Sequence, residues 1–216
     1  GKRYVSEKIT TGMKTQSATK AVMIRFNIKT DKLSEGKEYR LCVKTGREGQ
    51  WDSQNPQFTV FINGKTVQAL DTNHTWLPLE PDTEYSVYMY LYTGMVGGDF
   101  GARISLDTVD LKIESLYYDI SVPFECMKLL NCDSPEYYSI KSQLDKACLC
   151  LDLRKIYSEE FYKSIEKAAN YLKNEFYEKI CDKNKSPVVN CIGHTHIDVA
   201  YMWTVMQTKE KVQRSF

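Results

Sequence analysis

Two histidines and an aspartate alternate near the C-terminal end of the chain. His194, His196 and Asp198 follow the apolar run 188–192, which predicts a short buried strand. Alternate residues of an extended segment point to the same side, so the three side chains could share one face. Imidazole and carboxylate groups are ligands of divalent metals such as zinc. The spacing therefore predicts a metal site at the end of the strand.

A structural role for these residues is the competing interpretation. Histidines at strand ends are often hydrogen-bonded polar residues on the rim of a sheet, and a His-x-His pair alone is a weak motif. This chain, however, has only three histidines, and two of them lie in this stretch beside an aspartate. We therefore favour metal binding.

The longer string around the pair carries a family resemblance. Residues 193–216, GHTHIDVAYMWTVMQTKEKVQRSF, resemble the opening signature of the glycoside hydrolase family 38 alpha-mannosidases. The resemblance covers His-x-His-x-Asp, the following hydrophobic and aromatic residues up to Trp203, a Thr-x-x-Lys and a closing Arg-Ser-Phe. It implies that His196 and Asp198 bind a catalytic zinc and that His194 lies next to it. It also implies that Tyr201 contacts the bound mannose, where the family usually has tryptophan.

The resemblance further implies an activity and a limit to it. The family hydrolyses alpha-D-mannose from the non-reducing ends of glycans with retention of configuration, using a pair of carboxyl groups. Its nucleophile, its acid/base carboxylate and its remaining zinc ligands lie downstream of the motif. No catalytic residue is therefore expected within the 216 residues, and the chain is expected to be an inactive N-terminal region with a partial zinc site.

The elements that must position the motif begin with a β-rich half. Short β-prone runs separated by turn signals predict an antiparallel β-sandwich over residues 1–122. Asn63-Gly64 predicts a two-residue hairpin turn, and the stretch around it is similar to the N-terminal β-domain of the bacterial and vacuolar branch of these mannosidases. The predicted strands are residues 22–28, 38–44, 57–62, 66–70, 85–92, 102–106 and 110–120.

The second half has a helical period. Ser134-Pro135 and Ser158 are expected to begin two helices, and the second places Phe161, Ile165, Ala168, Leu172 and Phe176 on one face. Residues 123–186 are thus predicted to form a helical linker. Residues 187–216 would supply the first strand and helix of a truncated α/β, barrel-like catalytic domain. The predicted fold is an α+β multidomain fragment.

Composition restricts the partners. A net charge of +1 gives no sign of nucleic-acid or anionic-membrane binding, and no apolar stretch approaches the roughly 20 residues of a membrane-spanning helix. Seven cysteines at irregular spacing are typical of free thiols in a reducing compartment. We expect a cytoplasmic protein that acts on mannose-containing glycans, with a homo-oligomer possible.

Two other classes remain open. An amidohydrolase-type metal hydrolase also carries His-x-His after its first barrel strand, although it does not account for Tyr201-x-Trp203 or for the β-rich half. A noncatalytic β-module that binds glycans or mediates oligomerisation would account for the β-rich half alone.

Overall fold

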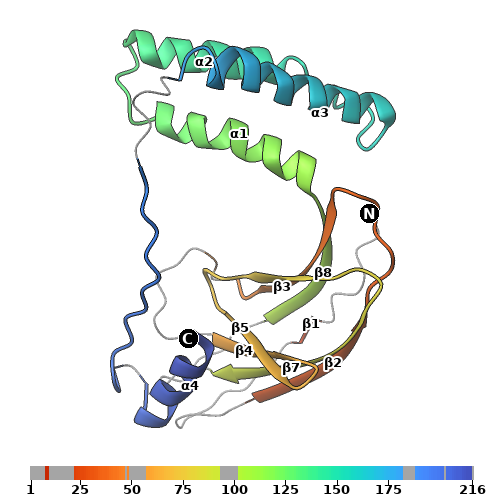
Figure 1. Ribbon diagram of the computed structural model, residues 1–216, viewed down its shortest axis with the longest axis vertical. Coiled ribbons are helices and arrows are strands. Elements are labelled where there is room, and N and C mark those ends of the chain that lie inside the picture. Colours follow the sequence, from red (N-terminus) through yellow and green to blue (C-terminus); the bar gives the residue numbers. More distant parts are fainter. Residues whose placement is uncertain are drawn as a thin grey trace. The chain divides into compact units, whose positions relative to one another are not determined.

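The chain folds into two compact units. The computed structural model describes residues 8–9, 22–46, 48, 57–92, 102–181, 188–201 and 203–215. One unit comprises Gly1–Val109 together with Ile192–Phe216, and the other comprises Asp110–Cys191 (Figure 1). Within these described residues, no helix is both long and apolar enough to cross a membrane.

The first unit contains two four-stranded antiparallel sheets, as the sequence predicts. The first sheet has the strand order β1-β8-β3-β6 and the second the order β2-β7-β4-β5. No barrel is formed by the described residues. The strands are β1 (Lys8–Ile9), β2 (Val22–Lys29), β3 (Lys37–Lys44), β4 (Gln57–Ile62), β5 (Lys65–Leu70), β6 (Trp76–Leu79), β7 (Glu84–Tyr92) and β8 (Ala102–Asp110).

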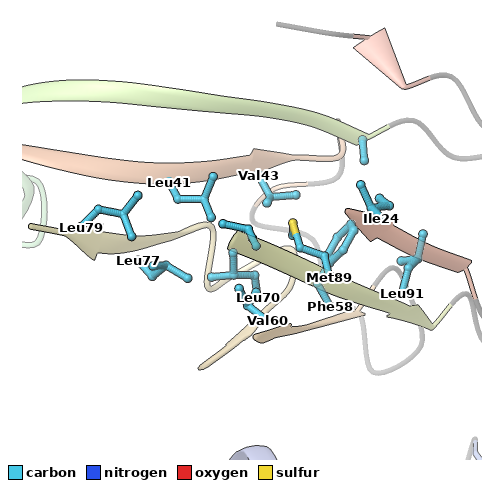
Figure 2. Packing of buried hydrophobic residues seen from close by; sticks show 12 residues of the cluster. Ile24, Leu41, Val43, Phe58, Val60, Leu70, Leu77, Leu79, Met89 and Leu91 are labelled. Carbon is cyan, nitrogen blue, oxygen red and sulfur yellow. The ribbon is translucent and has the colours of Figure 1, made fainter. Parts of the chain in front are cut away.

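The core of this unit comes from alternate residues of its strands. In β7, Val87 and Met89 have no exposed surface and Leu91 is 1% exposed, whereas the intervening side chains point to the opposite face. Phe58 and Val60 of β4 are also fully buried, and the cluster draws on both sheets (Figure 2). The predicted alternation is therefore confirmed, because side chains of a strand alternate between the two faces of its sheet.

Two local features explain details of the sheets. Asn63 and Gly64 have φ angles of 51° and 81° and join β4 to β5 in the predicted hairpin. The strand β6, which the sequence analysis did not predict, contains Pro78 and lies at the edge of the first sheet. Proline cannot donate a ladder hydrogen bond and is tolerated at such an edge.

The second unit is helical. Ser134 and Ser158 accept hydrogen bonds from the backbone N–H of the third residue of their helices, Tyr137 and Phe161, so both predicted helix starts are confirmed. All five residues of the predicted apolar face of the later helix are buried in one cluster with Leu116 and Leu144. The elements are α1 (Leu111–Met127), α2 (Pro135–Cys148), α3 (Glu159–Tyr171) and the π-helical η1 (Leu172–Tyr177).

The predicted strand 110–120 was wrong, since α1 begins at Leu111. Asp110 caps this helix by accepting hydrogen bonds from Lys112 N and Ile113 N. Pro123 lies inside α1 and cannot donate to the carbonyl of Asp119, which is four residues earlier. The hydroxyl of Tyr177 donates to that carbonyl at 2.9 Å instead. α1 is thus helical although its sequence is β-prone and contains a proline. The contact from Tyr177 satisfies the carbonyl that the proline leaves without a donor.

Candidate functional site

The segment that carries the motif has no regular secondary structure. Residues 188–198 are neither strand nor helix, and Val188, Val189 and Ile192 are 86%, 76% and 85% exposed. The predicted buried strand is therefore wrong for this chain. A parallel strand must be paired at its edges and covered on both faces, and the described residues give this run neither kind of neighbour.

Within this segment, His196 and Asp198 form a pair. The Nε2 atom of His196 lies 2.7 Å from Oδ1 of Asp198, and the two side chains are 76% and 51% exposed. His194 is also exposed, and no described residue bonds to its ring. The structure thus brings together two of the three alternating residues.

The chain after Asp198 is held by a turn and a helix. Ala200 has a φ of 56°, and its backbone N–H donates to Oγ1 of Thr208 at 3.2 Å. Thr204 accepts from Gln207 N at 3.3 Å and caps α4 (Val205–Ser215), which is the helix expected within residues 187–216. A positive φ is strained for alanine, and the bond to Thr208 stabilises it here.

Trp203 fixes the backbone at the motif. Its indole Nε1–H donates to the carbonyl of Asp198 at 3.1 Å, and its side chain is only 8% exposed. The Lys211 ammonium lies 4.1 Å from the Trp203 ring centroid, as in a cation–π contact. Trp203 is therefore a positioning residue for Asp198.

Tyr201 occupies the expected sugar-contacting position. Its ring is 56% exposed and meets Trp203 edge to face, with ring centroids 5.9 Å apart and planes inclined by 79°. Because Trp203 holds one edge of the ring, much of the remaining ring surface of Tyr201 faces solvent. An exposed and supported aromatic ring can stack on the apolar face of a sugar.

A contact that the sequence analysis missed anchors the motif to the sandwich. Lys211 Nζ donates to Oε1 of Gln57, the first residue of β4, at 2.6 Å. On the same side, burial raises the pKa of Tyr90, and the charge of Glu210 on α4 raises it further. Thr208 and Lys211 are the two ends of the Thr-x-x-Lys in the motif string. The Thr-x-x-Lys spacing was the available sequence signal for Lys211. It does not identify Gln57 as the partner of Lys211, which only the fold shows.

His196 and Asp198 carry donor atoms of the types that bind zinc, but they supply only two ligands. Imidazole nitrogen and carboxylate oxygen are both zinc ligands, but a catalytic zinc usually has three protein ligands. No group of three or more histidine, cysteine or acidic side chains among the described residues is arranged to hold a metal ion. The described residues alone therefore do not complete a zinc centre.

Comparisons with known proteins bear on the same segment. Residues 186–216 match the family described as the glycosyl hydrolases family 38 N-terminal domain. A comparison with curated proteins found no match. A solved structure titled "The structure of CBM51-2 in complex with GlcNAc and INT domains from Clostridium perfringens ZmpB" is similar at 12% identity and a TM-score of 0.24, over 69% of this chain and 34% of that chain. The family match is thus short and coincides with the segment that holds His196, Asp198 and Tyr201.

Proposed function

We propose that this chain is the N-terminal region of a retaining alpha-mannosidase of glycoside hydrolase family 38, of the bacterial or vacuolar-type branch. The observation that carries the proposal is the coincidence of the family match over residues 186–216 with the paired His196 and Asp198. The substrate would be the non-reducing-end alpha-D-mannose of a glycan. We also propose that the protein acts in the cytoplasm, where its thiols stay reduced.

In this proposal His196 and Asp198 are two ligands of a catalytic zinc. Their atoms Nε2 and Oδ1 lie within hydrogen-bonding distance, at 2.7 Å, and both side chains are accessible. The remaining donors would come from beyond the described residues. Trp203 and Lys211 would set the position of Asp198, because they connect its backbone to Gln57 at the start of β4. Support behind a metal ligand commonly changes metal affinity.

Tyr201 is proposed to contact the mannose ring. The ring is about half exposed and is braced by Trp203, so it can present a face without losing much conformational freedom on binding. Replacement of Tyr201 by tryptophan would enlarge the apolar face, while replacement by alanine would remove it. We expect the Tyr201→Ala variant to raise the KM for an aryl alpha-mannoside more than it lowers kcat, because the contact is with the sugar itself.

The metal role can be tested on this chain without any turnover. Zinc affinity is measured by competition with a chromophoric chelator for the unmodified chain and for His196→Ala, Asp198→Ala and His74→Ala variants. The exposed His74 pairs with the half-buried Asp71 at 3.1 Å, far from the motif in sequence, and so offers a second His–Asp pair as a control. We expect weak binding that both motif variants lose and that His74→Ala keeps. Equal binding by all four proteins would contradict the assignment.

The activity is tested on a full-length protein that contains the chain. Hydrolysis of an aryl alpha-mannoside is measured with and without chelator, beside an amide substrate. We expect chelator-sensitive mannoside hydrolysis that Asp198→Ala abolishes and His74→Ala leaves intact. Hydrolysis of the amide alone would favour the amidohydrolase alternative, and no hydrolysis of either would favour a noncatalytic module.

A further inference from the structure

The second sheet carries a groove on the face opposite its core. Two adjoining hollows, of about 520 and 470 Å³, share the side chains of Asn63 and Ser86. We call their combined surface the outer groove, and the residues that matter in it are Lys29, Phe61, Asn63, Glu84, Ser86 and Tyr88.

One end of the outer groove is aromatic. Tyr88 in β7 is the direct neighbour of Phe61 in β4 on one side and of Arg25 in β2 on the other. The Arg25 guanidinium carbon lies 5.0 Å from the Tyr88 ring centroid, and both aromatic side chains are half-buried. Met23, which is 61% exposed, also lines this end. Tyr88 therefore stands between Phe61 and the Arg25 guanidinium, and the two half-buried rings form an apolar surface beside Met23.

The other end offers hydrogen-bonding groups. Asn63 Oδ1 accepts a hydrogen bond from Ser86 N at 2.9 Å, which turns the amide NH₂ away from the strand. No described residue bonds to that NH₂ group, so it is available to a ligand. Lys29 and Glu84 form an exposed ion pair at 3.0 Å along the same edge. This end thus combines donors and acceptors with no excess of either charge.

We propose that the outer groove binds a neutral saccharide. A pyranose ring has apolar C–H faces, which stack on aromatic rings, and hydroxyl groups, which both donate and accept hydrogen bonds. Tyr88 and Phe61 would take the ring face, while Asn63 and the Lys29–Glu84 pair would bond the hydroxyls. The Lys29–Glu84 pair carries no net charge, so the hydrogen-bonding end of the groove does not favour an anionic ligand.

The outer groove is separate in sequence from the proposed mannosidase site. Its residues lie between positions 23 and 88, and none belongs to the segment that matches the family. The helix α4 packs against β5, and Lys211 contacts Gln57 at the first residue of β4, whereas Asn63 and Gly64 form the turn after its last. The inference therefore goes beyond the proposed function and does not depend on it.

The test is a chemical-shift titration of the 216-residue chain with alpha-linked mannobiose, maltose and the disaccharide of N-acetylglucosamine, with sorbitol as an acyclic polyol control. We expect binding of at least one disaccharide and none of sorbitol. Tyr88→Ala should weaken binding about tenfold or more, Tyr88→Phe should retain most of it, and Asn63→Gly should weaken it while tolerating the positive φ. Tyr117→Ala removes a tyrosine of α1 that is 63% exposed and should change nothing.

Three results would overturn the proposal. The first is the absence of disaccharide binding by a folded chain, and the second is binding that survives Tyr88→Ala. The third is binding that is lost in Asp198→Asn or with chelator and kept in Tyr88→Ala, which would place the sugar at the motif instead. A fall in the mass of the chain in solution on Tyr88→Ala, without sugar binding to the unmodified chain, would mark the surface as a protein interface.

Discussion

The β-sandwich and the motif segment are both rich in apolar residues, yet they meet different surroundings. Phe58 and Val60 of β4 have no exposed surface, while Val188, Val189 and Ile192 are between 76% and 86% exposed. The sandwich strands have hydrogen-bonded neighbours and a facing sheet, whereas residues 188–192 have neither among the described residues. An apolar run therefore becomes a strand only where other strands pair with it and cover it.

The largest expected effect is a loss of stability when a buried residue of the sandwich is truncated, compared with an exposed residue of the motif segment. Phe58→Ala should lower the free energy of unfolding of the sandwich by about 3–5 kcal/mol, because it leaves a cavity among fully buried side chains. Val189→Ala, at an equally apolar but exposed position, should change it by less than about 0.5 kcal/mol. Chemical denaturation of both variants gives the two values. A comparable loss for Val189→Ala would mean that the motif segment is packed in solution.

Two thiols provide a second comparison of the same regions. Cys42 is buried in β3, and burial, reinforced by the charge of Asp107, raises the pKa of its thiol to about 12. Cys191 is exposed in the motif segment. Because the thiolate is the reactive form, we expect Cys42 to be alkylated by iodoacetamide roughly tenfold or more slowly at pH 8. Mass spectrometry of timed samples measures both rates, and similar rates would contradict the buried position of Cys42.

The raised pKa of Cys42 also predicts a pH dependence. In the unfolded chain the thiol loses its proton near its ordinary pKa of 9.0, whereas in the folded chain it keeps the proton up to about 12. The folded state therefore binds more protons in this range, and stability should be fully present below pH 9 and fall as the pH rises towards 12. The Cys42→Ser and Cys42→Ala variants lack this thiol. Their midpoints of urea unfolding should therefore fall less between pH 9 and pH 12 than the midpoint of the unmodified chain.

The smallest expected effect concerns the link between the two regions. Lys211→Met removes the ammonium that bonds Gln57 and covers Trp203, while it keeps the aliphatic stem. We expect the backbone amides of α4 to exchange with deuterium faster, by about tenfold or roughly 1.4 kcal/mol, which is near the lower end for a hydrogen bond to a charged group. Lys209→Met, at an exposed position of the same helix, is the control. Unchanged exchange in Lys211→Met would show that other contacts hold α4.

Much of the fold was predictable, and the failures have physical causes. Alternation in β7, the Asn63-Gly64 turn and the caps at Ser134 and Ser158 are local signals, and each is found as predicted. The start of α1 was missed because its sequence is β-prone and contains Pro123. The hydroxyl of Tyr177, which is distant in sequence, donates to the Asp119 carbonyl that Pro123 cannot reach as a donor, and no local pattern predicts this contact.

The candidate site likewise has features that the sequence predicts and features that it does not. The residue types and their spacing at His194, His196 and Asp198 point to metal chemistry, and residues 186–216 match the family on which the mannosidase proposal rests. Spacing could not show that His196 pairs with Asp198 while His194 has no partner among the described residues. The metal, sugar and catalytic assignments stay predictions.

Local features of this protein follow from its residue order, because turns, caps and alternating apolar residues depend on near neighbours and on the choice of a buried face. Which apolar run is paired, that Tyr177 bonds the Asp119 carbonyl, and that Lys211 joins the motif to Gln57 depend on contacts between residues distant in sequence. So does the groove that Asn63, Ser86 and Tyr88 line, since their strands meet through pairing between residues distant in sequence.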